Sequence, residues 1–320
     1  MIYLFLFLLS FVLTYMVKEH AIRKAILDIP NDRSSHTVPT PRGGGIAIAV
    51  TWFMGLGILY ATDAIDARLF GALMVGVVLS MVSYLDDLYD LSPKLRLLVQ
   101  ALVALGGLWT LGGLGAIDMG FVRIENPLVV NIFAFLLIVW FVNLYNFLDG
   151  IDGYAASEAI FLALAAWALW GGAHFIVLAV AVLGFLLWNW HKAKIFMGDV
   201  GSTLLGYTVA ILTLYYATIE SANLWSWVVL FGLFWVDATV TLLRRWRKGE
   251  KLSQAHRKHA YQRLVQSGWA HDRVVIAGMA VNVLLLAILY YAPNQGVALG
   301  VASVVWALVL LSIEKKKGFQ

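Results

Sequence analysis

The chain has 320 residues, of which 61% are hydrophobic and 13% are charged. Soluble domains carry roughly half apolar and about a quarter charged residues, so this composition excludes an ordinary soluble domain and is typical of a protein embedded in a bilayer. The net charge of +4 requires no nucleic-acid partner, and the lack of cysteine excludes disulfides and thiolate metal sites.

Eleven apolar runs follow one another along the chain, separated by short polar connections. Their lengths suit helices that cross ~30 Å of hydrocarbon, for which roughly 17 to 25 residues are needed. The predicted transmembrane helices are 2–17, 44–62, 68–85, 95–112, 128–146, 156–171, 173–190, 203–219, 223–243, 274–292 and 296–313. Only two glycines separate the sixth run from the seventh, which leaves ten helices as the alternative count. We therefore predict an all-α polytopic membrane protein that forms one domain over residues 1–320.

The basic residues predict how this domain is oriented. No basic segment precedes the first run, whereas Lys18, Arg23 and Lys24 follow it directly. Because cytoplasmic loops collect Lys and Arg, the first run is predicted to be a retained anchor with a periplasmic N-terminus, and eleven crossings then give a cytoplasmic C-terminus. This topology places 21 of the 23 Lys and Arg residues on the cytoplasmic side and leaves only Arg68 and Arg123 outside.

Four polar clusters lie between the predicted helices, and the topology places all four on the cytoplasmic face. We expect the active site there, formed by the loops 18–43, 86–94, 147–155, 191–202 and 244–273. The carboxylates on the outer side are scattered, and we interpret them as solvated loop charges: Asp63, Asp66, Asp118, Glu125 and Glu220.

The first cluster is the acidic pair Asp86-Asp87 at the inner end of the third predicted helix. Adjacent carboxylates repel each other, so a cation should lie beside them. Lys94 and Arg96 follow closely and are candidate partners for phosphate or carboxylate groups. The alternatives are a solvated helix end for the two acids and ordinary cytoplasmic charges for the two cations.

The second cluster consists of Asn143, Asn146, Asp149 and Asp152, which follow one another at i, i+3 spacing. If the helix continues through them, they form one wall of two amides and two carboxylates. Such groups are expensive beside a membrane and are usually functional, and two interleaved glycines let a ligand approach the backbone. The alternative is a purely structural turn.

The third cluster places Asp199 between glycines, just before the predicted helix 203–219. Mg²⁺ prefers oxygen ligands and commonly takes only one or two from protein, and the N-terminus of a helix favours an anion. A Gly-Asp-x-Gly turn also forms without any ligand, so this motif by itself is weak.

The fourth cluster is the basic loop 244–273, which contains His256, Arg257 and His259. Zinc is disfavoured because no third nitrogen or thiolate lies nearby, whereas phosphate binding suits the cations. Topology and anionic lipid also favour a basic loop, but they explain the histidines less well. Asp237, in the ninth predicted helix, needs a partner or a water-filled cleft, and we interpret it as supporting the site or as structural.

Together and in this order, the clusters resemble the polyprenyl-phosphate N-acetylhexosamine-1-phosphate transferase family, which includes enzymes that start peptidoglycan lipid precursors, O-antigen and enterobacterial common antigen. The segments that carry the resemblance are 41–45, 84–87, 143–153, 196–202 and 256–259. Residues 32–36 and 259–262 resemble the O-antigen branch more than the peptidoglycan branch.

The resemblance implies a cytoplasmic cleft, Mg²⁺ with Mn²⁺ as the alternative ion, a UDP-linked N-acetylhexosamine donor and an undecaprenyl phosphate acceptor. It implies catalytic roles for Asp86, Asp87 and Arg96, and Arg96 stands where relatives place a lysine. It implies metal binding by Asn146 and Asp199 and a uracil contact for Asp152. It also implies contacts with the pyrophosphate or the sugar for His256, Arg257 and His259. Asp149 and Lys94 are further substrate-binding candidates because of their places in the clusters.

The implied reaction releases UMP and forms an undecaprenyl-pyrophosphate sugar, the first membrane step of O-antigen or another cell-envelope polysaccharide. The implied location is the bacterial inner membrane, with lipid contacts and a homodimer as further expectations. A transporter or flippase is the main rival, but its usual broken helices and paired repeats are missing from the sequence. A phospholipid-forming alcohol phosphotransferase would concentrate its acids in one helical region, whereas here they come from three loops.

Overall fold

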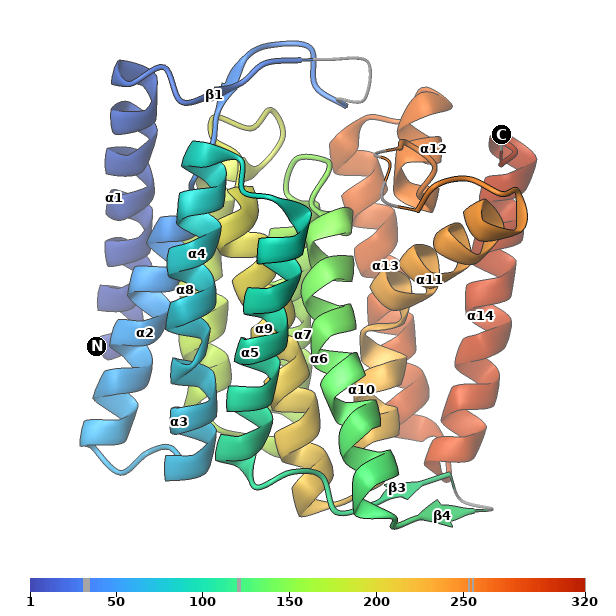
Figure 1. The fold of residues 1–320 in the computed structure, drawn as a ribbon. Helices are drawn as coiled ribbons and strands as arrows, with labels where there is room; N and C mark the ends of the chain where they lie inside the picture. Colours follow the sequence, from blue (N-terminus) through green and yellow to red (C-terminus); the bar gives the residue numbers. More distant parts are fainter. Residues whose placement is uncertain (31–34, 120–121, 253, 255, 320) are drawn as a thin grey trace.

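The structure is a computed structural model that describes residues 1–30, 35–119, 122–252, 254 and 256–319. Within these residues the chain forms helices and two small antiparallel hairpins (Figure 1). The helices are α1 (Ile2–Arg23), α2 (Gly45–Ala61), α3 (Ala67–Met74), α4 (Gly76–Tyr89), α5 (Pro93–Leu111), α6 (Pro127–Leu148), α7 (Tyr154–Trp170), α8 (Ala173–Asn189), α9 (Gly198–Ile219), α10 (Asn223–Leu230), α11 (Gly232–Arg247), α12 (Ala260–Gln266), α13 (His271–Tyr291) and α14 (Gln295–Lys316). The hairpins pair β1 (Leu27–Asp28) with β2 (Thr40–Pro41) and β3 (Ile117–Asp118) with β4 (Arg123–Ile124).

Each predicted apolar run coincides with one helix or with two consecutive helices. Of the described residues, seven helices are long and apolar enough to cross a membrane, with α3 and α4 together forming one of them, and α10 with α11 makes an eighth if that bent pair is one span. Three further apolar helices, α2, α7 and α8, are shorter. The chain is therefore an all-α, multi-pass membrane protein.

Two glycines separate α7 from α8, as the sequence analysis anticipated. Gly171 and Gly172 have φ of +71° and +99°, a region that side chains with a Cβ rarely adopt. The chain reverses there, and α7 and α8 pack against each other as separate helices. The alternative of one continuous helix over 156–190 is wrong.

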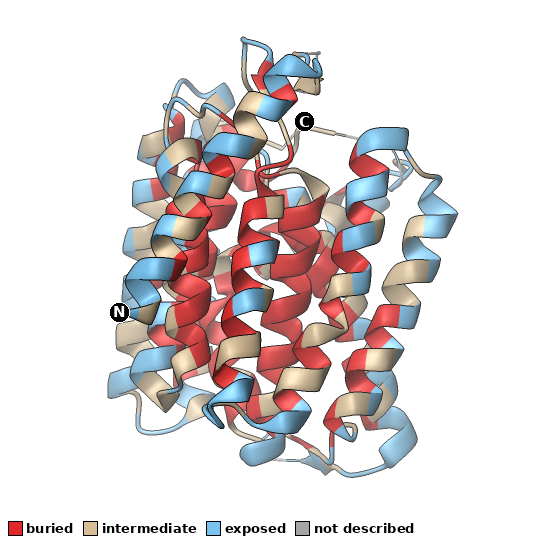
Figure 2. Ribbon diagram, turned by 90° about the vertical axis from the view of Figure 1, so that its left-hand side faces the viewer, coloured by how far each residue is buried: buried red, intermediate tan, exposed pale blue. Residues whose placement is uncertain are grey.

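Helix α9 forms the centre of the bundle and is buried along almost its whole length, as the red ribbon in Figure 2 shows. It packs against α2, α4 and α6. Glycines make this close packing feasible: a Cβ on Gly45 would lie 2.2 Å from the backbone nitrogen of Gly201, and one on Gly206 would lie 2.5 Å from the carbonyl oxygen of Phe141. The first turn of α9 is thereby held between the ends of α2, α4 and α6.

The two ends of the bundle differ in character (Figure 1). One end carries β1, β2, α12, the last turn of α14 and the loops that follow α4, α6 and α8. The other end carries β3, β4 and the connection from α2 to α3, and both predicted outer cations, Arg68 and Arg123, belong to it. All four polar clusters lie at the first end. The fourth, the basic loop, reaches the other three because α11 bends by 74° from α10.

Candidate active site

The acidic pair lies in the last turn of α4, where Asp86 and Asp87 point to different partners. Asp86 Oδ1 accepts the backbone N–H of Leu91 at 2.7 Å, which caps the end of the helix. Its Oδ2 lies 3.2 Å from Arg96 Nη1. The same guanidinium nitrogen is 4.0 Å from Asp199 Oδ2, so Arg96 is the cation expected beside the acids.

Asp87 faces the start of α9 rather than α5. Its Oδ1 accepts the backbone N–H of Asp199 at 3.4 Å, while Oδ2 is buried without a hydrogen-bond partner among the described residues. Arg42 donates a hydrogen bond to the carbonyl oxygen of Asp87. A buried carboxylate oxygen with no donor is an expensive arrangement, and it is what a ligand for a cation looks like before the cation binds.

A glycine-rich segment holds the start of α9 in place. The backbone N–H groups of Gly44 and Gly45 donate to the carbonyl oxygens of Phe196 and Met197 at 2.9 and 2.8 Å. Gly198 follows with φ of +74°, and a Cβ there would lie 2.9 Å from Asp87 Oδ2. The glycines of segment 41–45 therefore bring α2 against the 196–198 loop and so determine where Asp199 lies.

The helical wall predicted over 143–152 is wrong in its second half. Helix α6 ends at Leu148, so Asn143 and Asn146 are helical, whereas Asp149 is the C-cap and Asp152 lies in the following turn. The helix cannot continue because the next residues, up to Gly153 at φ of +72°, turn the chain into α7. The two amides also separate: Asn143 Nδ2 donates to Gln100 on α5 at 2.7 Å, and Asn146 turns toward α9.

Asn146 and Asp199 meet directly. Asn146 Nδ2 donates to Asp199 Oδ1 at 2.9 Å and contacts Ser202 Oγ at the same distance. Helix α9 begins at Gly198, five residues before the predicted start, so Asp199 sits in its first turn. With Asp87 Oδ2 close to Gly198, the oxygens gathered here come from two carboxylates, and Asn146 presents its Nδ2 to them; a half-turn of that amide would add its oxygen and complete a donor set that suits a hard divalent cation.

Asp149 lies beside these acids at the end of α6. Loss of hydration raises the pKa of Asp149 well above its ordinary value, and the negative charges of Asp199 and Asp87 raise it further. A carboxyl group in such surroundings is stabilised when a cation or a hydrogen-bond acceptor joins it. Asp149 thus marks the region where positive charge is missing.

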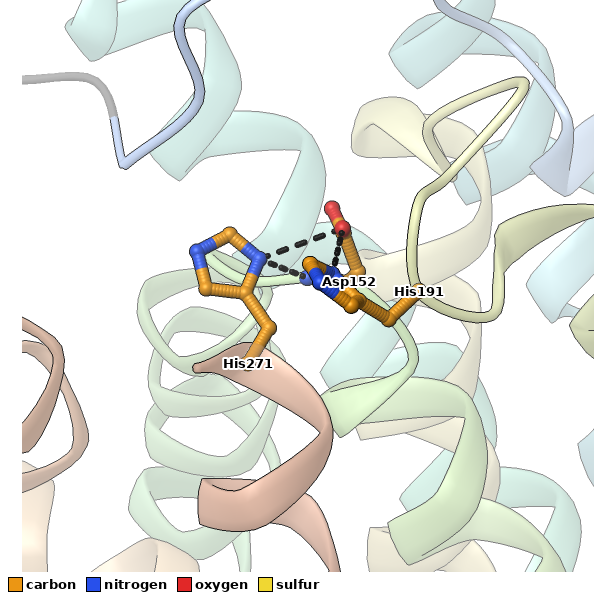
Figure 3. Close-up of side chains that lie close together, drawn as sticks. All are labelled: Asp152, His191 and His271. Carbon is orange, nitrogen blue, oxygen red and sulfur yellow. Dashed lines mark hydrogen bonds and ion pairs between the residues drawn. The ribbon is translucent and has the colours of Figure 1, made fainter. Parts of the chain in front are cut away.

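Asp152 forms a compact cluster with two histidines from distant parts of the chain (Figure 3). Its Oδ2 lies 2.9 Å from His191 Nδ1 and 3.2 Å from His271 Nδ1, and it accepts the backbone N–H of Ala193 at 3.3 Å. Burial raises the pKa of Asp152, but the hydrogen bonds from His271 and His191 outweigh it, so the pKa lies below its ordinary value. Asp152 therefore stays ionised and fixed in orientation.

The basic loop is organised around a buried arginine. Arg245 is only 2% exposed, and its guanidinium donates to the carbonyl oxygens of Lys251, Leu252 and Gln254 at 2.7, 3.3 and 3.0 Å and pairs with Glu250 at 2.9 Å. Topology, the alternative reason for the basic loop, does not account for the buried position of Arg245. This side chain closes the 250–254 turn that leads to the histidines.

Asp237 connects this loop to α12. Its Oδ1 accepts the backbone N–H of Ala260 at 2.8 Å and the hydroxyl of Thr241 at 3.0 Å, and it lies 3.4 Å from His259 Nδ1. The contacts of Asp237 fit both interpretations given for it, since it holds the first turn of α12 and also lies against the imidazole of His259, which lines a cavity at this end of the protein. Burial, followed by the positive charges of His259 and Arg245, lowers the pKa of His256 to about 4.

The end of α14 clamps the same loop from the other side. Glu314 Oε2 accepts hydrogen bonds of 2.7 Å from both Arg244 and Arg263, and Oε1 accepts the backbone N–H of Phe319 at 2.8 Å. The ring of Phe319 lies 5.3 Å from the Arg244 guanidinium and 5.2 Å from Lys248 Nζ. Arg244 and Arg263 are therefore paired with Glu314 within the protein.

Two of the cavities at this end of the protein hold most of the predicted site residues. The first, the helix-side cavity, has a volume of about 540 Å³ and is lined largely by α4, α5 and α6, with apolar side chains such as Leu79, Val82 and Leu97. The second, the loop-side cavity, has about 440 Å³ and is lined mainly by polar residues of the connecting loops. Asn146 and Asp199 line both cavities, so this pair stands at the boundary between them.

The predicted site residues divide between the cavities in a regular way. The helix-side cavity is lined by Asp86, Arg96, His256 and His259, and the loop-side cavity by Asp87, Asp149 and Asp152. Lys94 is exposed and lines neither cavity. Arg257 lines neither as well, and its carbonyl oxygen accepts a hydrogen bond from Gln266. Residues 32–34 of the segment 32–36 lie outside the described residues.

The sequence did not single out Arg42, Gln262 and His271, which line the cavities, or His191, which lies beside Asp152. Gln262 lines both cavities, and Arg42 contacts Asp87. A signal existed for His191, which lies in the loop 191–202. His271 likewise lies in the loop 244–273, but nothing in its local sequence indicates that the start of α13 meets the α6–α7 turn.

Comparison with known proteins identifies the family of the chain. Residues 69–217 match the family model described as glycosyl transferase family 4, a stretch that includes both acids of the 86–87 pair, Arg96, Asn146 and Asp199.

Among curated proteins, the chain is 31% identical to the probable undecaprenyl-phosphate N-acetylglucosaminyl 1-phosphate transferase of Bacillus subtilis, over 83% of this chain and 76% of the relative. It is 30% identical to the undecaprenyl-phosphate alpha-N-acetylglucosaminyl 1-phosphate transferase of Yersinia pestis, over 86% and 79%. It is 28% identical to the decaprenyl-phosphate N-acetylglucosaminephosphotransferase of Mycobacterium tuberculosis, over 84% and 76%. The chain therefore belongs to glycosyl transferase family 4, among the polyprenyl-phosphate N-acetylhexosamine-1-phosphate transferases.

Proposed function

We propose that the protein transfers N-acetylglucosamine-1-phosphate from UDP-N-acetylglucosamine to undecaprenyl phosphate and releases UMP. The observation that carries the proposal is the Asn146–Asp199 pair, which lines both cavities and so lies where two substrates can meet. The choice of sugar is supported by the names of the relatives, which all specify N-acetylglucosamine.

The two cavities suit two different substrates. The loop-side cavity is lined by polar groups of the connecting loops, which suits a water-soluble sugar nucleotide, and Asp152 supplies an ionised acceptor for an N–H group of its base. The helix-side cavity has apolar walls from α4 and α5 below the charged Arg96, which suits a phosphate carried on an isoprenoid chain. The phosphate of the lipid in the helix-side cavity and the pyrophosphate of the sugar nucleotide in the loop-side cavity would then face each other across Asp199.

The residues present fit a magnesium ion, with manganese as the alternative. Asn146 and Asp199 would hold the ion, and the unpartnered Oδ2 of Asp87 supplies a third oxygen. The two carboxylates offer oxygens as they stand, and the amide of Asn146, whose Nδ2 donates to Asp199, would offer its Oδ1 after a half-turn. Oxygen is the ligand type that Mg²⁺ prefers, and such sites leave the remaining positions to phosphates and water. The bound ion supplies neutralisation of the charge on the donor pyrophosphate.

In the proposed reaction an oxygen of the lipid phosphate attacks the phosphorus that carries the sugar. The new P–O bond forms as the bond from that phosphorus to the UMP oxygen breaks, and UMP leaves with the electron pair. A phosphate monoester has a second pKa near 6, so the acceptor is largely dianionic at pH 7 and gains little from a strong base. Arg96, which is fixed by Asp86, is positioned to draw the lipid phosphate toward the donor, and Asp87 orients the start of α9.

The finer topology is part of the same proposal. Eleven crossings would put the end that carries both cavities in the cytoplasm of a bacterium, at the inner membrane, with the N-terminus in the periplasm. The distribution of 21 of the 23 Lys and Arg residues supports this orientation. We also propose that the product starts O-antigen or another cell-envelope polysaccharide and that the protein can form a homodimer.

The test is UMP release by the purified protein given Mg²⁺, undecaprenyl phosphate and one UDP-sugar at a time. UDP-N-acetylglucosamine should give the highest kcat/KM of a panel of UDP-N-acetylhexosamines, and release should stop without the lipid. Asp199→Asn should abolish most of the activity at every Mg²⁺ concentration, because one metal ligand loses its charge. A protein that releases no UMP from any UDP-sugar, or that releases UMP equally well as Asp199→Asn, would contradict the proposal.

A further inference from the structure

We propose that Asp152, His191 and His271 form a second metal site, one that binds a divalent transition metal such as zinc. The three side chains are drawn together in Figure 3, and each offers one ligand atom. These atoms all lie within 4.8 Å of one another. One carboxylate and two imidazoles leave coordination positions open, as in zinc sites that also hold water or a substrate group.

Two of the three distances between the ligand atoms are close to those around a bound ion. Ligands held about 2.05 Å from zinc at a tetrahedral angle lie about 3.3 Å apart. Asp152 Oδ2 is 3.2 Å from His271 Nδ1 and 2.9 Å from His191 Nδ1, and all three ligand atoms lie within 4.8 Å of one another, so binding would bring the two rings together around the ion. Both histidines approach the same carboxylate oxygen from different elements.

The hydrogen bonds around His271 point to a positive group between the two side chains. Its Nδ1 accepts the backbone N–H of Asp152 at 3.3 Å, which uses the lone pair of a neutral ring. The same nitrogen faces the negative Oδ2 of Asp152 at 3.2 Å, and two lone pairs facing each other repel. A proton on Nδ1 turns this contact into a hydrogen bond to Oδ2, and a metal ion on Nδ1 would take the place of the bond from the backbone N–H, so either one removes the repulsion. The second imidazole on the same oxygen favours the metal.

The position of the cluster allows an ion to enter and stay. Asp152 and His271 line the loop-side cavity, and the side chain of His191 is 28% exposed, whereas that of Asp152 is 8% exposed. The ligands come from the α6–α7 turn, the α8–α9 loop and the first residue of α13, so packing of three helices fixes their separation. The site therefore needs no rearrangement of the backbone.

The donor atoms distinguish this site from the proposed magnesium site. Asn146, Asp199 and Asp87 offer oxygen only, which suits Mg²⁺, whereas two imidazole nitrogens select zinc, cobalt or nickel over magnesium. A metal on Asp152 also occupies the carboxylate that the donor base would contact. This consequence rests on the proposed function, and it predicts that zinc raises the KM for the UDP-sugar.

The binding test uses the full-length protein in detergent, after removal of any histidine tag and in excess Mg²⁺. Cobalt(II) is the probe because its visible absorption bands report nitrogen ligation, and zinc should displace it. We expect one cobalt per chain in the wild type and at least a tenfold weaker affinity in His191→Gln and in His271→Gln. His20→Gln, which removes an exposed histidine of α1, and His256→Gln should bind as the wild type does.

The outcomes separate the metal site from its consequence. Wild-type absorption bands in His271→Gln, loss of the bands in His256→Gln, or no cobalt bound to a monodisperse wild-type protein would overturn the site. Circular dichroism and size-exclusion profiles that match the wild type show that the glutamine variants are folded, and Asp152→Asn provides a second variant that removes the anionic ligand. Zinc should raise the donor KM of the wild type at least tenfold and that of His271→Gln by less than twofold. If cobalt binds but zinc does not raise the donor KM, the metal site stands and the contact between Asp152 and the donor base is overturned. If the protein releases no UMP, the proposed function is overturned and the cobalt result stands.

Discussion

Replacement of Arg245 by methionine tests whether a basic residue in the 244–273 loop is structural. The side chain is 2% exposed and donates three hydrogen bonds to carbonyl oxygens of the 251–254 turn. At about 1 kcal/mol net for each bond, their loss costs roughly 3 kcal/mol. We leave the ion pair with the solvent-exposed Glu250 out of this sum, because such pairs contribute little.

A loss of roughly 3 kcal/mol corresponds to on the order of 100-fold more opening of the turn, since every 1.4 kcal/mol is a factor of ten. Opening exposes the loop to proteinase K, whose cleavage rate follows the open population when opening and closing are fast. We therefore expect Arg245→Met to be cleaved between 248 and 258 up to about 100 times faster than the wild type. The kcat/KM for UMP release should also fall, because the turn leads to His256 in the helix-side cavity.

The matched control is Arg247→Met, which removes the same charge two residues away from an exposed position. It should leave both the cleavage rate and kcat/KM within about twofold of the wild type, as is usual for surface substitutions. Equal cleavage rates for the two variants would refute the reasoning, since they would mean that the charge matters for topology alone. Arg245→Lys, which keeps the charge but loses the planar fork, should lie between the two.

Three further predictions concern the site and its support. Gly198→Ala should lower kcat for UMP release about tenfold. The reason is that φ at this position is +74° and the added Cβ would lie 2.9 Å from Asp87 Oδ2, which together cost roughly 1–2 kcal/mol. A variant with the kcat of the wild type would contradict this close approach. The wild-type KM for the donor should stay constant from pH 8 to about 5, since the lowered pKa of Asp152 keeps this carboxylate ionised. In His271→Gln the hydrogen bond that lowers this pKa is lost while burial still raises it, so as the pH falls the KM should begin to rise at a higher pH than in the wild type. Coinciding pH profiles of the two proteins would count against the role of His271. Glu314→Gln should raise the donor KM roughly fivefold with little change in kcat. The variant weakens the partly solvated contacts of Glu314 with Arg244 and Arg263, at a cost of about 1 kcal/mol. An unchanged KM would show that these contacts do not position the loop.

The sequence by itself determined the membrane architecture and the family. Hydrophobic runs of bilayer length are a local property, so all eleven predicted runs appear as helices or helix pairs, and Gly171-Gly172 divides α7 from α8 where the prediction had them divided. The ordered motifs also identified the family, because their residues are adjacent in the chain. The prediction that a cation accompanies the 86–87 pair needed only the repulsion of like charges, and Arg96 meets it.

Only the tertiary structure decided which polar groups share a cavity. Periodicity extended the helix of Asn143 and Asn146 through Asp152, whereas the chain turns after Leu148, and Asp152 instead meets His271, 119 residues later. The charge of Arg245 is compatible with an ordinary loop position, yet its side chain is buried and donates to carbonyl groups of a turn. Local sequence cannot report these contacts, since they depend on how α9, α11 and α13 pack, and that packing is a property of the whole bundle.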